Sequence, residues 1–352
     1  MTIIKQIHKK SSLDGQLTLF LPKREILGTI NKVEPIEGVV VYGHNVEKRK
    51  IIGQIVVTFR YGREEDEVMG LHFSKDLFLV SEEIYPLGKT NRSVSKIQQK
   101  IMDKYGPNAL PFRFSIGANT PKTVTIQPGV TEKGQPCGVY YALRVFPSND
   151  ETKLKANKQE MIEMSIRKTE IGPQGKGRMP SCIIRKDFLL SPGELELEAT
   201  LDKPLYIYGE QMKVNLSIRN YSNKSVKRIV ILVLQNIDVS MFTSGNYSVS
   251  ILNLDSQEGC PVNPGSCLNK TFTICPSGGT EGRGIALESP LPGEEKKLAS
   301  SSLLCPELGK EEIFGIQISY CVRIKLQMGA IAGELVGELP FLLMSRSNKL
   351  KG

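Results

Sequence analysis

Short runs in which apolar and polar residues alternate recur along most of the chain. Residues 16–21 read Q-L-T-L-F-L, with an apolar side chain at every second position before the run becomes continuously apolar. A period of two puts alternate side chains on one face, so this pattern predicts a β-strand buried on one side. Further segments rich in β-branched and aromatic residues are expected to form strands at 51–59, 71–80, 123–127, 138–146, 161–167, 194–201, 212–218, 226–234, 313–326 and 333–343.

Turn-forming residues separate many of these segments. Examples are P-I-E-G at 35–38, P-G at 128–129, S-P-G at 191–193 and N-P-G at 263–265. Many short strands with frequent turns indicate an all-β fold of the sandwich type. Because 352 residues are too many for one sandwich, the sequence predicts two β-sandwich domains.

One segment departs from this pattern, since residues 92–104 read R-S-V-S-K-I-Q-Q-K-I-M-D-K. Val94, Ile97 and Ile101 are spaced as on one face of a helix. Basic residues four apart form a stripe on another face, namely Arg92, Lys96, Lys100 and Lys104. We expect one amphipathic helix on the first domain, capped by Asn91 and ended by the Gly-Pro pair at 106–107. Its basic face is either a solvated surface or a contact for anions or membrane headgroups.

The domain boundary is expected in a segment without alternation. Residues 171–183 read I-G-P-Q-G-K-G-R-M-P-S-C-I and contain three glycines and two prolines. Such a composition is typical of a linker. We therefore predict a first domain at 1–171, a hinge at 172–183, a second domain at 184–345 and a short end at 346–352.

The positive charge is concentrated in the first domain. Lys plus Arg number 46 and Asp plus Glu 37, which gives a net charge of +9. Residues 1–50 hold nine basic and five acidic side chains, and residues 84–133 hold eight basic and two acidic ones. A basic face of this kind favours an anionic partner, such as a phosphorylated protein segment or an anionic membrane. Nucleic acid is not expected, because the basic residues are not interleaved with aromatic ones.

The sequence contains few of the usual catalytic or metal-binding patterns. It has seven cysteines and three histidines, with no C-x-x-C, H-E-x-x-H, G-x-x-x-x-G-K-[ST] or G-x-S-x-G motif. We therefore expect no enzyme activity, no metal site and no cofactor. The longest aliphatic run, at 229–234, is far shorter than the roughly 20 residues of a membrane span. The N-terminus has no apolar signal region, and a cytoplasmic protein is expected.

Several longer stretches resemble the arrestin family. They are F-R-Y-G-R-E-E-D-E-V-M-G-L-H-F at 59–73, K-R-E at 23–25, V-E-P-I-E-G-V-V at 33–40, M-S-I-R-K at 164–168 and L-A-S-S-S-L-L at 298–304. Residues 185–198 and 258–266 resemble arthropod visual arrestins in particular. The resemblance covers residues 3–344. It implies two seven-stranded antiparallel, immunoglobulin-like β-sandwiches with one short helix on the first.

The resemblance also implies a function. Arrestins bind activated, usually phosphorylated, seven-helix receptors and block the G protein sterically. A visual member would terminate signalling by light-activated rhodopsin, and would be recruited from the cytoplasm to the photoreceptor or plasma membrane through the receptor. The alternative is an arrestin-like trafficking scaffold that links receptor cargo to endocytic or signalling partners.

Arg167 matches the family's phosphate-sensing arginine, which lies in a buried cluster of carboxylates. The carboxylates that match here are Glu25, Glu288 and Glu295, where the family usually has aspartates. A receptor phosphate would compete for the guanidinium, and the carboxylates left behind would repel one another. Considered without the resemblance, Arg167 fits an ordinary strand arginine better, with its carbon stem packed and its head in solvent.

Further site residues follow from the same resemblance. The residues that match receptor-phosphate ligands are Lys9, Lys10, Lys23, Arg24 and Lys168. Asp14 stands where the family often has more positive charge, so the dependence on receptor phosphorylation is open. The family's finger loop, which enters the receptor, matches Arg63, Glu64, Glu65, Asp66, Glu67, Val68, Met69, Gly70 and Leu71. Without the resemblance these residues fit a solvated hairpin turn. Residues 127–138 and 240–248 match two loops expected to make secondary receptor contacts.

A small basic cluster in the second domain comprises Lys224, Lys227 and Arg228. It is expected either to bind inositol phosphates or anionic lipids, or to form a solvated strand edge. Typical arrestins continue beyond the position of Gly352 with an acidic tail that latches the resting state and, in some members, binds clathrin and adaptors. From the sequence in hand we expect a weakly latched resting state and no coupling through such a tail.

Overall fold

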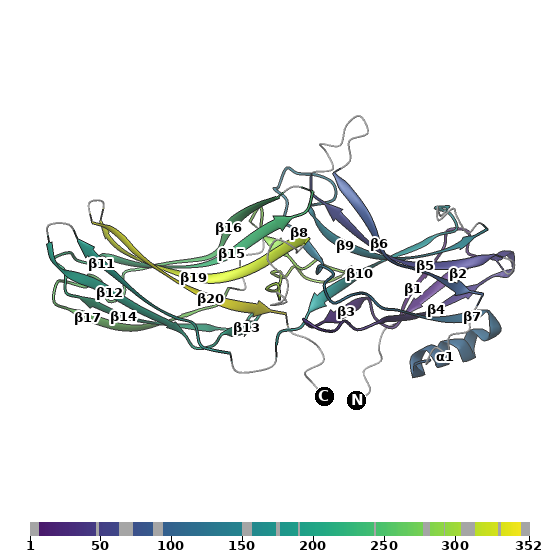
Figure 1. Cartoon of the computed structure of the whole chain (residues 1–352), viewed down its shortest axis with the longest axis horizontal. Helices are drawn as coiled ribbons and strands as arrows, with labels where there is room; N and C mark the ends of the chain where they lie inside the picture. Colours follow the sequence, from purple (N-terminus) through teal and green to yellow (C-terminus); the bar gives the residue numbers. More distant parts are fainter. Residues whose placement is uncertain are drawn as a thin grey trace.

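A computed structural model describes residues 7–46, 49–62, 73–86, 94–149, 157–173, 177–188, 191–242, 244–276, 282–291, 293–303, 314–329 and 332–345. These residues form two β-sandwich lobes placed end to end, with the strands of each running roughly along the long axis of the molecule (Figure 1). The all-β, two-sandwich fold predicted from the alternation of apolar residues is confirmed.

The first lobe packs two sheets against each other. The antiparallel four-stranded sheet has the order β1–β2–β4–β7, with β1 (His8–Ser11), β2 (Leu17–Leu21), β4 (Ile36–Tyr42) and β7 (Ala109–Phe114). The facing sheet contains β3 (Glu25–Gly28), β5 (Lys50–Arg60), β6 (Ser74–Tyr85), β8 (Val124–Ile126), β9 (Gly138–Ser148) and β10 (Ile162–Glu170). Phe59, Phe112 and Val139 are among the side chains buried in the core. A 3₁₀ turn, η1 (His44–Val46), follows β4.

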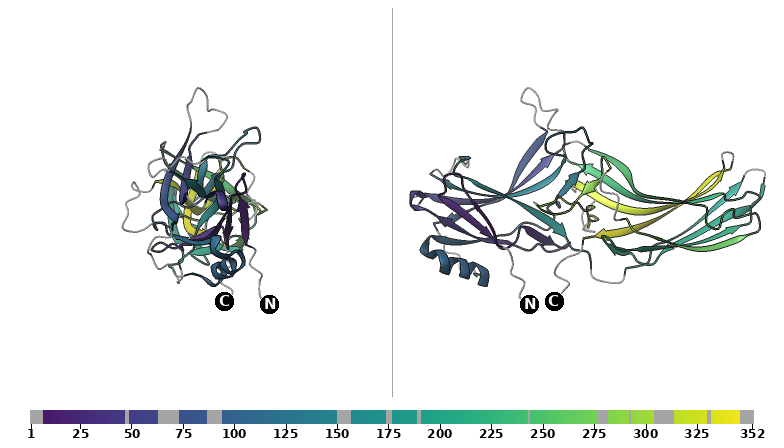
Figure 2. Two further views of the ribbon diagram at one scale, coloured as in Figure 1. Left: turned by 90° about the vertical axis from the view of Figure 1, so that its right-hand side faces the viewer. Right: turned by 180° about the vertical axis from the view of Figure 1, so that it is seen from behind.

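The second lobe repeats this arrangement (Figure 2). One sheet has the order β11–β12–β14–β17, with β11 (Ser181–Phe188), β12 (Ser191–Leu201), β14 (Met212–Asn220) and β17 (Cys267–Ile274). The other has the order β13–β20–β19–β15–β16, with β13 (Leu205–Ile207), β15 (Arg228–Ser240), β16 (Ser244–Ser256), β19 (Gly315–Gly329) and β20 (Gly333–Met344).

Two details differ from the implied pair of seven-stranded antiparallel sandwiches. The described residues form more than seven strands in each lobe, because short strands of three or four residues such as β3, β8 and β13 are separate elements. Two strand pairs, β3 with β10 and β13 with β20, are parallel. The first of these parallel pairs positions the candidate site described below.

The predicted helix is present as α1 (Lys96–Tyr105) and lies on the outside of the first lobe (Figure 1). The expected cap, Asn91, lies outside the described residues, and the helix begins later because Ser95 and Gln98 form a capping box. Ile101 is buried against the four-stranded sheet. Gln98 is buried as well, and its Nε2 donates to the carbonyls of Gly38 (2.9 Å) and Phe112 (3.0 Å). Gly106 and η3 (Gly106–Asn108) end the helix where predicted.

Two of the connections between the lobes involve the course of the chain within the described residues. The chain passes between them after Glu170, and β11 begins at Ser181, so residues 181–183, predicted to lie in the hinge, instead pair with β12. The second connection is β18 (Ala286–Leu287), which comes from the second half of the chain but pairs with β8 of the first lobe. Gln235 of β15 holds the same short strand from the other side, through hydrogen bonds of 2.7 and 2.8 Å to the backbone of Ala286.

The anchoring of α1 to the four-stranded sheet by Gln98 can be tested by mutation. Replacing Gln98 with alanine leaves two buried carbonyls without this donor, and we expect a loss of about 1–3 kcal/mol in the free energy of unfolding. Gln99→Ala is the matched control, because Gln99 is exposed and its amide bonds only to Asp103, so we expect a change within about 0.5 kcal/mol. Urea denaturation of both variants measures the difference, and equal stabilities would contradict the anchoring role of Gln98.

Candidate functional site

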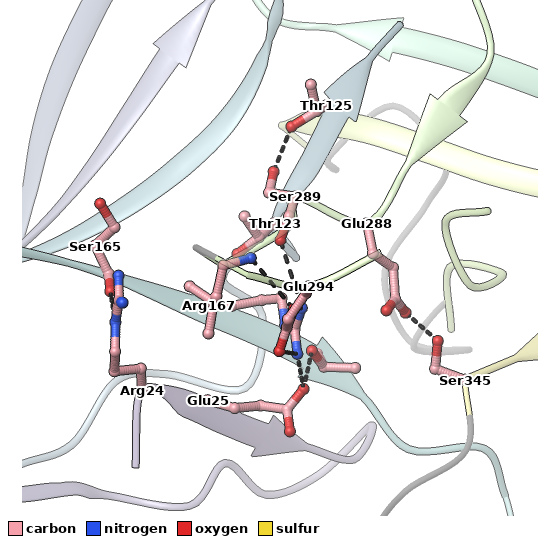
Figure 3. Close-up of polar contacts among 12 residues, drawn as sticks. Arg24, Glu25, Thr123, Thr125, Ser165, Arg167, Glu288, Ser289, Glu294 and Ser345 are labelled. Atoms are coloured by element: carbon pink, nitrogen blue, oxygen red, sulfur yellow. Dashed lines mark hydrogen bonds and ion pairs between the residues drawn. The ribbon is translucent and has the colours of Figure 1, made fainter. Parts of the chain in front are cut away.

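Arg167 lies on β10 at the junction of the two lobes, between carboxylates from two other segments (Figure 3). The parallel pairing of β10 with β3 sets Arg167 directly opposite Glu25, and Arg167 Nη2 is 2.9 Å from Glu25 Oε1. Arg167 Nη1 is 2.5 Å from Oε2 of Glu294. The guanidinium thus joins the first lobe to the segment around β18. One donor has no partner among the described residues, since the buried Nε of Arg167 makes no hydrogen bond there.

This cluster is only partly withdrawn from solvent. The side chain of Arg167 is 12% exposed, whereas those of Glu25 and Glu294 are 33% and 39% exposed. Burial alone would lower the pKa of Arg167, but the charges of Glu25, Glu294 and Glu288 outweigh it and raise that pKa above its ordinary value. Partial burial likewise opposes ionisation of Glu294, but its hydrogen bond to Arg167 lowers its pKa overall. Both groups are therefore held in their charged forms, and the carboxylates remain partly exposed to solvent.

The structure corrects the identity of one carboxylate. Glu295 was expected beside Arg167, but Glu294 takes that position and Glu295 is exposed. The reason is a turn in which the Glu294 backbone N–H donates to the Leu291 carbonyl and the Glu294 carboxylate accepts from the Leu291 N–H. This turn directs Glu294 inward, toward the guanidinium.

Glu288, the third expected partner, forms no hydrogen bond or ion pair with Arg167 among the described residues and turns toward the end of β20 (Figure 3). Its carboxylate accepts hydrogen bonds from the hydroxyls of Ser300 and Ser345. It is 8% exposed, and it acts on Arg167 through its charge alone. Of the three glutamates predicted as one cluster, only Glu25 contacts Arg167, while Glu288 belongs to a second site and Glu295 to neither.

A second cation, Lys122, belongs to the site around Glu288. Lys122 is buried, and its Nζ donates to the backbone carbonyl of Ser300. Burial lowers the pKa of Lys122 to about 8, although Glu170 and Glu288 oppose the shift. The sequence patterns did not identify Lys122 as a site residue. The available signal is a lysine two positions before Val124, with the same parity as this buried first residue of β8.

Lys168 does not lie where a receptor phosphate could reach it. It is 2% exposed, and its Nζ donates to the carbonyls of Ala118 (3.1 Å) and Thr120. The cause is the pleat of β10, because Lys168 has the same parity as the inward-facing Ile166. Burial lowers its pKa to about 8. Lys168 is therefore buried in this conformation, and its role as a receptor-phosphate ligand stays a prediction.

The other predicted phosphate ligands lie near one another on the surface. Lys9, Lys10 and Arg24 line a depression of about 430 Å³ together with Ile7, His8, Met164 and Ser165. Arg24 Nε donates to the Ser165 carbonyl at 2.7 Å, and the Arg24 carbonyl accepts from the Arg167 N–H at 2.8 Å. The depression thus adjoins the Arg167 cluster. Lys23 instead forms an ion pair with Glu34.

The predicted finger loop at 63–71, including Arg63, Met69 and Leu71, lies outside the described residues. Its base is described and is aromatic. The Tyr61 N–H donates to the Phe73 carbonyl at 2.8 Å, and the Tyr61 ring lies 5.1 Å from that of Phe242 in the second lobe. Phe242 in turn packs against Phe314, which contacts Phe59. The base of this loop is therefore coupled to the predicted contact loop at 240–248.

The basic cluster of the second lobe is less compact than expected. Lys227 and Arg228 line a depression of about 480 Å³ with residues of β19 and β20, but Lys224 does not line it. Arg228 forms an ion pair with Asp255 at 3.0 Å. The Lys224 carbonyl accepts a hydrogen bond from the buried Asn220.

The fold and this site define a two-domain β-sandwich protein with a charged cluster at the domain junction. Two family models match the chain, "Arrestin (or S-antigen), N-terminal domain" over residues 27–170 and "Arrestin (or S-antigen), C-terminal domain" over residues 191–348. The protein belongs to the arrestin family. Arrestins are non-enzymatic adaptor proteins that bind activated G-protein-coupled receptors and desensitise them.

Named relatives are similar over nearly the whole chain. An arrestin homolog of Heliothis virescens is 44% identical over 96% of this chain and 90% of its own length. Phosrestin-2 of Drosophila melanogaster is 40% identical over 98% of this chain and 95% of its own length. The lateral-eye arrestin of Limulus polyphemus is 42% identical over 96% of this chain and 84% of its own length. Within the described part of the chain, no helix is long and apolar enough to span a membrane.

Mutation can test whether Glu294, and not Glu295, is the carboxylate partner of Arg167. Glu294→Gln removes one of the two carboxylates that contact Arg167, and we expect it to lower the free energy of unfolding by about 1 kcal/mol, a modest value because the side chain is partly exposed. Glu295→Gln is the matched control and should have no measurable effect. Amide hydrogen exchange should also accelerate across residues 286–301 only in the first variant. The opposite ranking of the two variants would restore Glu295 as the partner.

The buried lysines predict a pH dependence of stability. Lys122 has a pKa of about 8 in the folded protein and about 10.5 when unfolded. Between these values the unfolded chain keeps a proton that the folded chain has released, so the free energy of unfolding rises with pH. Lys122→Met should reduce this slope by up to about 1.4 kcal/mol per pH unit.

Urea denaturation at pH 7.5, 8.5 and 9.5 measures that slope. Lys213→Met, at an exposed position of β14, serves as the control and should keep the wild-type slope. If Lys122→Met also kept the wild-type slope, the assigned burial of a charged Lys122 would be contradicted.

Proposed function

We propose that this protein binds light-activated, phosphorylated rhodopsin, or a related G-protein-coupled receptor, and terminates signalling by excluding the G protein. The observation that carries the proposal is Arg167, held between Glu25 and Glu294 at the lobe junction beside a basic depression. The similarity to the lateral-eye arrestin of Limulus supports the visual role. On this proposal the protein acts in the cytoplasm and reaches the membrane through the receptor.

The proposed switch follows from charge competition. A receptor phosphate carries a charge of about −1.5 to −2 and offers three strong acceptor oxygens, and a guanidinium can bind two of them at once. Lys9, Lys10 and Arg24 would capture the phosphate first, because they line the depression that adjoins Arg167. Arg167 would then exchange its carboxylates for the phosphate.

Once the Arg167 guanidinium had moved to the phosphate, Glu25 and Glu294 would face each other without a counter-charge. The two negative charges would repel each other. The attraction between Arg167 and Glu294, which holds the 291–294 turn against the first lobe, would also be lost. The two lobes would then be free to rotate about the 171–180 connection, which joins β10 to β11. Lys122 and Glu288 would keep the rest of the β18 segment attached, because no phosphate reaches them in their buried site.

The finger loop would enter the activated receptor, as the match at 59–73 implies. The aromatic contacts from Tyr61 through Phe242 to Phe314 tie its base to the second lobe. A rotation of the lobes would therefore change the position of the loop. Lys227 and Arg228, which line a separate depression, are the proposed contacts for inositol phosphates or anionic lipids in the second lobe.

The proposal is tested by co-sedimentation with membranes of an arthropod rhodopsin that is dark or illuminated, and phosphorylated or not. We expect wild-type protein to bind illuminated, phosphorylated membranes best. Arg167→Glu should bind illuminated membranes to a similar extent with or without phosphate, because it has already lost the attraction that the phosphate removes. We expect its binding to unphosphorylated membranes to rise about tenfold, which corresponds to about 1.4 kcal/mol.

Arg144→Glu is the control for this experiment. Arg144 also lies on a strand between two carboxylates, Asp76 and Glu163, but it contacts no residue of the second lobe in the ion pairs described. Its phosphate dependence should equal that of the wild type. Binding that does not depend on light in any state would contradict the visual role and favour the trafficking scaffold.

A further inference from the structure

The basic depression contains one group that the proposed function does not use. His8 opens β1, pairs with Leu21 of β2, and lines the depression with Lys9, Lys10 and Arg24. Its side chain is half-buried, whereas those of Lys9 and Lys10 are exposed. Because side chains alternate along a strand, His8 shares a side with Lys10, whose Nζ donates to the Glu163 carbonyl of β10 at 2.5 Å.

The described charges around His8 are mainly positive. Lys9 and Lys10 flank it on β1, and Arg24 borders it from the turn before β3. On β10, Glu163 is already paired with Arg144, and Ser165 offers no charge. Of the acidic groups that pair with cations around the depression, Glu34 is paired with Lys23 and Glu294 with Arg167. The opposing residue of β2, Leu21, is apolar.

In this setting an imidazole is neutral until an anion arrives. Burial, and then the charge of Arg24, lowers the pKa of His8 below its ordinary value of 6.5. A phosphate of charge near −2 in the same depression reverses the local potential and stabilises the imidazolium, which has two N–H donors. The proton and the phosphate then favour each other's binding.

We propose that His8 is a proton-dependent ligand of the phosphate captured in this depression, so that capture is accompanied by proton uptake and strengthens as the pH falls below neutral. This inference rests on the proposed function, and it adds a residue and a pH dependence that the basic side chains alone do not provide. Lysine and arginine keep their charge throughout this range, so they give no such dependence. The phosphate itself has the opposite tendency, since it loses charge as the pH approaches its second pKa near 6.

The test uses a synthetic peptide with two phosphoserines and its unphosphorylated counterpart. Dissociation constants are measured by isothermal calorimetry at pH 7.5, 6.75 and 6.0 and constant ionic strength, for the wild type and for His8→Gln. Glutamine keeps hydrogen-bonding capacity but does not titrate. We expect the ratio of wild-type to variant affinity to rise about fivefold from pH 7.5 to 6.0, within the limit of about tenfold per pH unit for one proton.

Two further measurements complete the test. His44→Gln, a change at the other described histidine, should keep the wild-type pH profile because His44 lies in η1 and does not line the depression. Calorimetry in buffers of different ionisation enthalpy should show more proton uptake by the wild type than by His8→Gln. Since the phosphate is the same in both, its own titration cancels in the comparison.

The outcomes distinguish failure of the role of His8 from failure of the proposed function. Parallel pH profiles for the wild type and His8→Gln, with phosphate-dependent binding retained, would overturn the role of His8 and leave the proposed function intact. Equal affinity for the phosphorylated and unphosphorylated peptides at every pH would overturn phosphate capture itself, and the role of His8 with it.

Discussion

The parallel pairing of β3 with β10 is the constraint on which the site depends. Because both residues stand on paired strands, it places the Arg167 guanidinium directly opposite the Glu25 carboxylate. The surrounding structure supports this register, since Ile162, Met164 and Ile166 on the other face of β10 are buried in the first lobe. An arginine with a fixed strand position and two partly exposed carboxylates can respond to an added anion by exchanging partners, with little change in the core beneath it.

The cations of the first lobe fall into two groups with different tasks. Lys9, Lys10 and Arg24 keep their head groups at or near the surface, where screening makes them adaptable contacts for an anion. Lys122 and Lys168 are buried, and their amino groups donate hydrogen bonds to backbone carbonyls of neighbouring segments. A net charge of +9 thus overstates the positive surface that a partner meets. The useful quantity is the charge that remains accessible after the interior lysines are removed from the count.

Much of this arrangement could be predicted from the sequence, and the failures have physical causes. The alternation of apolar and polar residues predicted the two sandwiches, and the helical spacing of apolar residues predicted α1. Both patterns depend only on residues close together in the sequence. The edge strand β16 was not predicted, since most of its side chains are exposed and polar and its run does not read as a buried face. The parity that buries Lys168 beside Ile166 was available in the sequence, but a motif match took precedence over it. The choice of Glu294 over Glu295 depends on one turn at 291–294, which no periodic pattern encodes.

The pairing of β18 with β8 has a consequence for modularity. A polypeptide cut in the connection between β10 and β11 would keep every strand of the first lobe except this one, which lies more than a hundred residues further along the chain. Its sheet would then end at β8, with backbone donors and acceptors left open to other chains. The first lobe, taken as a continuous stretch of sequence, therefore lacks one strand of the sheet that it forms in the whole protein. Duplication or exchange of the lobes during evolution would have to carry β18 along or replace it.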